Sequence, residues 1–278
     1  MSEQAKIVLQ QLIKAVETDQ IKLPTLPEVA LKIREAVEKD NQSAIDIANL
    51  LSQDTSLSAR LLQLANSPLY RARAEIDNLQ MAVTRLGIRI VKDLVVMLAI
   101  KQTFKTKDKG IEAQFKDIWQ TSVDVAAVCR VLAKTQPGLD VEHAMLAGLI
   151  HNIGSLPIIE LADRQPSLFS STQNIKDITN EIQGELGEKI LHFWNFPESL
   201  INVTKHWDQF TRNHETKADY VDIVQAAILH TKLAASQAQE DWSKIPAISK
   251  LGLDPGVRKL DESLQIELDD TRKSLMQA

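Results

Sequence analysis

Apolar side chains recur every three or four residues along most of the chain, which is the spacing of one face of an α-helix. Residues 5–17 show it with Ile7, Val8, Leu12, Ile13 and Val16. Further helices are predicted after Pro27, from Ser43 to Leu51, after Asp54, from Asp77 or Asn78 to Gly87, and over 88–103. The spacing of Ser43 and Asp46 is that of a capping box, and Asp54 is placed to cap the helix that follows it.

The second half of the chain repeats this helical pattern without any convincing alternation of a β-strand. Helices are predicted over about 112–134, 142–152, 181–192, 197–208, 219–236 and 261–275, and the polar stretch 163–177 is predicted to be a loop. The fold class is therefore all-α. The polar segment 105–110 predicts a division into an N-terminal helical subdomain (1–105) and a helical core (111–236), followed by a C-terminal tail (237–278) that ends in a helix.

Composition narrows the classes of function. Of the 278 residues, 44% are hydrophobic and 25% are charged, as in an ordinary globular protein, and the net charge of −5 argues against general nucleic-acid binding. The single cysteine, Cys129, lies in an apolar helical context and is interpreted as a buried side chain. No signal peptide and no run of about 18 apolar residues is evident, so we expect a cytoplasmic protein without a membrane span.

One apolar stretch carries candidate chemistry. Gly148–Gly154 contains His151 and Asn152 between glycines. A His-Asp pair here would suit a metal site, because imidazole and carboxylate are common ligands. Asn152 offers only a neutral amide, which cannot balance the charge of a cation.

Several motifs, in order along the chain, resemble the HDOD family. They are Leu23-Pro24-Thr25-Leu26-Pro27, the runs 61–67 and 82–87, Trp119-Gln120-Thr121-Ser122, the stretch 148–154, and Trp194-Asn195-Phe196-Pro197 followed by His206. The resemblance covers about residues 20–235. It implies a fold like that of HD-type phosphohydrolases without their full set of metal ligands, and a role in bacterial signalling.

The resemblance also implies positions for the HD ligands. They fall on Thr121, on His151 and Asn152, on Gln183, on His206 and Trp207, and more loosely on Thr231. Only His151 and His206 among these have the usual ligand chemistry, and a catalytic zinc site typically has three protein ligands. We therefore expect a vestigial pocket with no metal or other cofactor. If a metal binds, Asp124, three residues after Thr121, is the candidate third ligand beside the two histidines, although an exposed helical Asp is the simpler interpretation.

A local excess of positive charge lies between residues 60 and 92. The segment holds six basic side chains (Arg60, Arg71, Arg73, Arg85, Arg89 and Lys92) against two acidic ones (Glu75 and Asp77), a balance of +4. The five arginines are a candidate patch for a partner protein or a phosphate group, since guanidinium groups suit phosphate and carboxylate. A solvated face with scattered ion pairs is the plainer interpretation.

The sequence thus predicts a non-catalytic HDOD regulatory module that binds a signalling protein or small ligand in trans. Two alternatives remain open. One is a metal-dependent phosphohydrolase with a rearranged site, and the other is a nucleotide sensor that does not hydrolyse its ligand.

Overall fold

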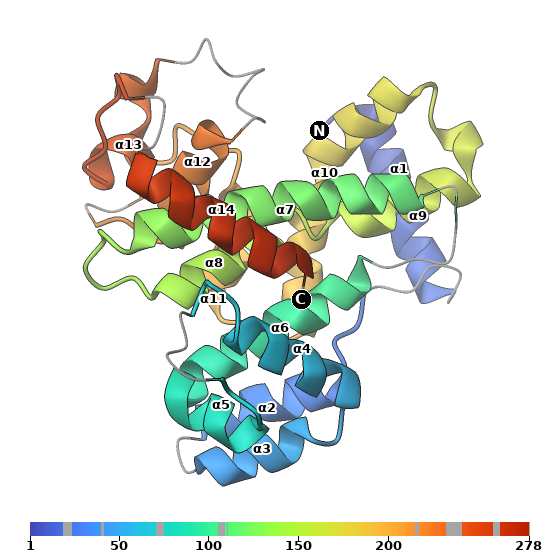
Figure 1. Cartoon of the computed structure of the whole chain (residues 1–278). Coiled ribbons are helices and arrows are strands. Elements are labelled where there is room, and N and C mark those ends of the chain that lie inside the picture. The colour runs from blue at the N-terminus through green and yellow to red at the C-terminus, as the bar shows by residue number, and fades with distance from the viewer. Residues whose placement is uncertain are drawn as a thin grey trace.

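The structure is a computed structural model that describes residues 1–18, 24–39, 42–70, 75–104, 109, 111–214, 217–231, 241–257 and 262–277. Within these ranges all regular structure is helical and no strand occurs, which confirms the predicted all-α fold class. Figure 1 shows three groups of helices, with the long helix α7 crossing the upper part of the molecule.

The helices between residues 28 and 103 form the lower group in Figure 1. Its helices are α2 (Glu28–Glu38), α3 (Ala44–Leu51), α4 (Thr55–Ala65), α5 (Leu79–Leu86) and α6 (Ile88–Thr103). We call these five helices the N-terminal lobe. The predicted caps are confirmed: Ser43 and Asp46 form a capping box, and Asp54 accepts a hydrogen bond from the backbone N–H of Leu57 at 3.0 Å.

The remaining helices form the two upper groups. They are α1 (Glu3–Glu17), α7 (Glu112–Ala133), α8 (Val141–Ile150), α9 (Ser155–Arg164), α10 (Thr172–Phe193), α11 (Glu198–His206), α12 (Tyr220–His230), α13 (Pro246–Lys250) and α14 (Glu262–Gln277), with 3-10 turns at Pro166–Leu168 and Trp242–Lys244. Helix α1 packs on α9 and α10, away from the N-terminal lobe, and α14 packs on α7. The predicted division at 105–111 falls between α6 and α7, and the subdomain boundaries stay a prediction.

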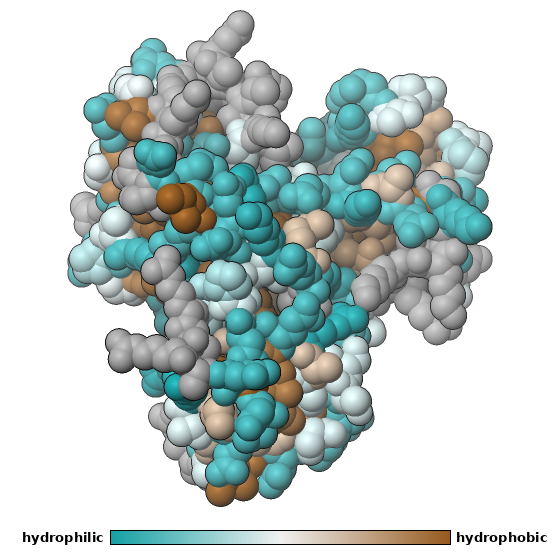
Figure 2. Space-filling view, in the orientation of Figure 1, coloured by the Kyte–Doolittle hydropathy of each residue, from teal (hydrophilic) through white to brown (hydrophobic). Residues whose placement is uncertain are grey.

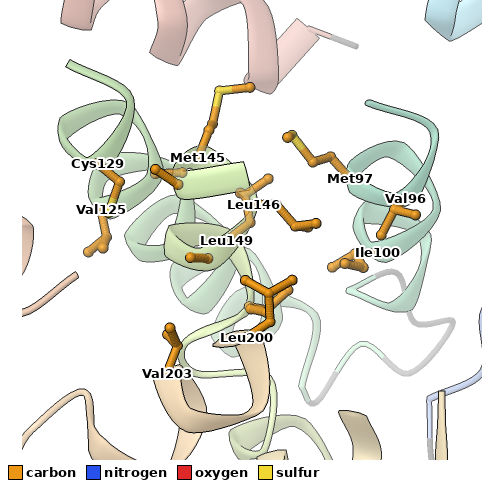
Figure 3. Close-up of a cluster of buried hydrophobic side chains, with 14 of the residues drawn as sticks. Val96, Met97, Ile100, Val125, Cys129, Met145, Leu146, Leu149, Leu200 and Val203 are labelled. Carbon is orange, nitrogen blue, oxygen red and sulfur yellow. The ribbon is translucent and has the colours of Figure 1, made fainter. Parts of the chain in front are cut away.

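The main core lies where the N-terminal lobe meets the upper helices. Figure 3 shows side chains converging there from four helices: Val96, Met97 and Ile100 of α6, Val125 and Cys129 of α7, Met145, Leu146 and Leu149 of α8, and Leu200 and Val203 of α11. Cys129 is fully buried, which raises the pKa of its thiol. A smaller apolar cluster joins α1, α9 and α10.

The prediction of a loop over 163–177 and of a helix starting at 181 was wrong in part. Helix α10 begins at Thr172, and the side chain of Ser171 caps it by accepting from the N–H of Asn174 at 3.1 Å. Its first two turns are polar and carry few apolar side chains before Ile178. Hydrophobic periodicity therefore could not reveal this part of the helix.

The segment Val141–Arg164 has the length and apolar composition of a membrane-spanning helix. The sequence analysis had found no such run. In the structure the segment is α8, a tight turn and α9, and 89% of its most apolar window is buried within the protein. Buried core helices of globular proteins often have this length and composition, so the segment is weak evidence for a membrane span.

Candidate functional site

The His151–Asn152 turn joins α8 to α9 and is held by two close backbone approaches. A Cβ added to Gly148 would lie 2.5 Å from the Cα of Ala126 in α7. A Cβ added to Gly154 would lie 2.0 Å from the backbone oxygen of Gln183 in α10. Since real Cβ atoms do not approach so closely, glycine at both positions lets the turn sit tightly between α7 and α10.

His151 is buried and already engaged. His151 is only 3% exposed, and its Nδ1 lies 2.7 Å from the carbonyl oxygen of Gly148. A carbonyl oxygen can only accept, so Nδ1 carries the proton and Nε2 keeps the lone pair. The ring packs edge-on against Trp207 with 5.6 Å between centroids. Burial removes water from the imidazolium and lowers the pKa of His151 to about 4, so the ring is neutral at physiological pH.

Asn152 is also satisfied by its neighbours. The hydroxyl of Ser122 in α7 donates to its side-chain Oδ1 at 2.8 Å, and the hydroxyl of Ser155 donates to its backbone oxygen at 2.7 Å. The amide thus joins the turn to α7 and to the start of α9. Sequence reasoning missed Ser122 because nothing in its local spacing distinguishes it from Thr121.

The end of α11 closes the other side of this turn. His206 is half-buried, and its Nδ1 lies 3.0 Å from Oε1 of Gln209. The fully buried Gln225 of α12 donates from Nε2 to the backbone oxygens of His206 and Gln209, at 2.8 and 2.9 Å. These contacts fix the α11 end that carries Trp207. Gln225 was not predicted, because it lies 19 residues from His206 in a mostly apolar helix.

The other predicted pocket residues have fewer described contacts with the His151–Asn152 turn. Thr121 is half-buried in α7, Gln183 is 5% exposed in α10, and Thr231 donates to the backbone oxygen of Ile228 at 2.8 Å. Asp124, the candidate third ligand, pairs with Nε of Arg272 in α14 at 2.7 Å. The described contacts therefore bring together His151, Asn152 and Trp207, and they give Asp124 a different partner.

The residues present do not fit the metal centre of the active superfamily. Among the described residues, no group of three or more His, Cys, Asp or Glu side chains is placed to hold an ion. His151 retains one imidazole lone pair, but Asn152 beside it is a neutral amide whose oxygen already accepts from Ser122. Asn152 therefore gives a cation at this turn no anionic oxygen of the kind that hydrolytic centres use.

The predicted arginine patch is described only in part. Arg85 at the end of α5 and Arg89 in the first turn of α6 are exposed, and Arg60 of α4 is half-buried. Lys92 pairs with Asp93 at 3.3 Å. Two further members, Arg71 and Arg73, lie outside the described residues.

The Trp194–Pro197 motif contacts the N-terminal lobe. The guanidinium of the buried Arg34 in α2 donates to the backbone oxygen of Trp194 at 2.6 Å and to that of Asn195. It also lies over the ring of Phe196, 4.4 Å from its centroid. The indole of Trp194 donates in return to the backbone oxygen of Pro24 at 2.9 Å. The corner before α11 is thus fixed by the N-terminal lobe.

Comparison with known proteins agrees with the all-helical fold. A model of the HDOD domain matches residues 23–210. A crystal structure from Shewanella amazonensis SB2B, described as a "Putative metal-dependent phosphohydrolase", is 27% identical with a TM-score of 0.80, and the match covers 99% of this chain and 100% of that one. An HDOD domain protein of unknown function from Geobacter sulfurreducens is 22% identical with a TM-score of 0.67, covering 96% and 98%. At that identity the likeness shows the fold alone.

An uncharacterized protein from Treponema pallidum (strain Nichols) is 25% identical over 193 residues. That match covers 66% of this chain but 37% of the other protein, so the chain spans well under two thirds of its relative. The family match extends over more than half of the chain and includes the His151 turn and the Trp194 corner. The chain belongs to the HDOD family.

Proposed function

We propose that this HDOD protein is a non-catalytic regulatory module of bacterial signalling, which binds a partner protein or a small ligand in trans. The observation that carries the proposal is the state of the His151–Asn152 turn. Its imidazole and amide are buried and hydrogen-bonded within the protein, and a neutral amide cannot balance the charge of a metal ion as a carboxylate would. The turn therefore joins α7, α8 and α10 as a structural element.

A metal-dependent phosphohydrolase with a rearranged site is the alternative. It is supported by the Shewanella protein, which is described by that activity and is 27% identical. It is also supported by the tautomer of His151, because a backbone carbonyl that fixes Nδ1–H leaves Nε2 available, as in many metal-ligating histidines. Against it, Asp124 is paired with Arg272 in this structure.

A phosphodiesterase assay separates the two functions. The purified protein would be incubated with Mn²⁺ or Fe²⁺ and a chromogenic phosphodiester, beside His151→Ala and a His192→Ala control. His192 is exposed on α10 and lies outside the turn. The proposal predicts that any turnover is equal in all three proteins. Turnover that is lost in His151→Ala and kept in His192→Ala would establish the enzyme instead.

We propose that the partner binds at the arginine patch. Arg85 and Arg89 are exposed on the N-terminal lobe, and their guanidinium groups suit carboxylate or phosphate. We expect Arg85→Gln with Arg89→Gln to weaken binding of a purified partner at low salt, while Arg164→Gln on α9 leaves it unchanged. Equal affinity of all variants would remove this surface from the proposal.

A further inference from the structure

The C-terminal helix α14 packs on one side of α7 and adds apolar side chains to the main core, with Leu264 and Met276 partly buried against it. Figure 1 shows α14 lying across α7 at the front of the molecule. Within the described part of α14, Leu268 and Leu275 are the buried apolar side chains, at 2% and 3% exposure. They are seven residues apart and so lie on the same helix face. Figure 2 shows that the outer surface over α14 is mainly hydrophilic.

Charged contacts add to this attachment. Glu267 accepts from the guanidinium of Arg130 in α7 at 2.6 Å and also pairs with Lys134, the residue that follows α7. At the other end, Nζ of Lys101 in α6 donates to the backbone oxygens of Leu275 and Met276, at 3.0 and 2.8 Å. Three cations thus face the carboxylate and the negative C-terminal end of α14.

The same cations reach other parts of the protein. Arg130 also pairs with Glu142 of α8 at 3.4 Å, and Glu142 accepts from the hydroxyl of Tyr70, which follows α4. Lys101 lies over the ring of Trp119, 5.7 Å from its centroid. These basic groups therefore keep partners within the fold when α14 leaves, and the face beneath the helix can stay assembled.

We propose that this face, formed by α7 and Lys101, is a docking site for an acidic amphipathic helix of a partner protein, and that α14 occupies it in cis. The partner helix carries a carboxylate next to one of two leucines spaced by seven residues, the pattern of Glu267, Leu268 and Leu275. The inference rests on the proposed function, since it names a second surface, apart from Arg85 and Arg89, at which a partner binds in trans. Helices bind grooves with such i and i+7 anchors in many complexes.

Charge complementarity selects this occupant. Lys101, Arg130 and Lys134 lie on the covered face. Of the acidic groups there, Glu142 is already paired with Arg130 and Tyr70, and Asp124 pairs with Arg272 of α14. A basic helix would meet like charges at both ends. An acidic helix with one basic residue near Asp124 meets opposite charges throughout.

The experiment uses the full chain and a fluorescent peptide with the sequence of residues 262–277. Its binding would be measured for the wild type, for Leu268→Ala with Leu275→Ala, and for the control Ile266→Ala, whose side chain is on the outer side and 58% exposed. The double variant weakens the cis helix, so we expect it to bind the peptide at least about tenfold more tightly than the wild type. The control should bind as the wild type does.

Two further measurements complete the test. Adding Lys134→Met to the double variant should reduce peptide affinity, and raising salt should weaken binding through screening of the ion pairs. Equal affinity for the wild type and the double variant, or unfolding of that variant by circular dichroism, would overturn the proposal. A dimer of the double variant in light scattering would identify a second copy as the occupant and would likewise overturn it. None of these readings depends on metal content or hydrolysis, so the proposed function is tested separately.

Discussion

The neutral, buried imidazole of His151 predicts a specific loss of stability in acid. Its pKa falls from the ordinary value of 6.5 to about 4 because burial disfavours the imidazolium. The unfolded chain therefore binds a proton that the folded chain rejects between these two pH values. Stability contributed by this residue is fully present above about pH 6.5 and decreases as the pH falls toward 4.

The size of the effect follows from the difference in pKa. At about 1.4 kcal/mol per pH unit, a fall from 6.5 to about 4 corresponds to about 3 kcal/mol in the free energy of unfolding. Between about pH 7 and pH 5 the expected loss is about 2 kcal/mol. This is a large part of the stability of an ordinary domain.

Urea unfolding of the wild type and of His151→Gln at several pH values measures it. Other groups titrate in the same range, including the carboxyl of Glu142, whose pKa is raised by burial. Their contributions are common to both proteins and cancel in the difference. We expect the wild type to lose about 2 kcal/mol more than the variant between about pH 7 and pH 5. Parallel curves would show that His151 is solvated or charged in the folded protein, and the reasoning would be refuted.

Two further predictions concern packing. Arg34→Ala should destabilise the protein by about 2–5 kcal/mol in urea unfolding, because the backbone oxygens of Trp194 and Asn195 lose a charged donor. The control Lys32→Ala, on the exposed side of α2, should cost under about 0.5 kcal/mol. Gly154→Ala should cost about 1–3 kcal/mol or more, because its Cβ would lie 2.0 Å from the backbone oxygen of Gln183. A cost of Gly154→Ala below that of Lys32→Ala would contradict the close approach.

Local features of the sequence predicted the helices well where the signal itself is local. The capping pairs at Ser43 and Asp54 and the apolar spacing of α6 and α7 depend on residues a few positions apart, and the structure confirms them. The start of α10 escaped prediction because its first turns are polar. The Ser171 cap is a local signal, and it would have placed the start correctly.

Contacts between distant residues were beyond sequence reasoning. Arg34 and Trp194 are separated by 160 residues, and Ser122 and Asn152 by 30. No periodicity connects such residues, so neither the joint between the lobes nor the partner of Asn152 could be predicted. The residue type at position 152 did limit the chemistry of the turn, because an amide carries no charge in any surroundings, whereas the charge state of His151 depends on its burial. Which carboxylate or amide lies near it is decided by packing.

Metal content of the purified protein tests the central claim most directly. The protein would be equilibrated with Mn²⁺, Fe²⁺ or Zn²⁺, separated from free ions and analysed by mass spectrometry, beside His151→Ala and His192→Ala. The account predicts the same metal content, well below one ion per chain, in all three proteins. One or more ions per chain in the wild type and in His192→Ala, lost in His151→Ala, would contradict it.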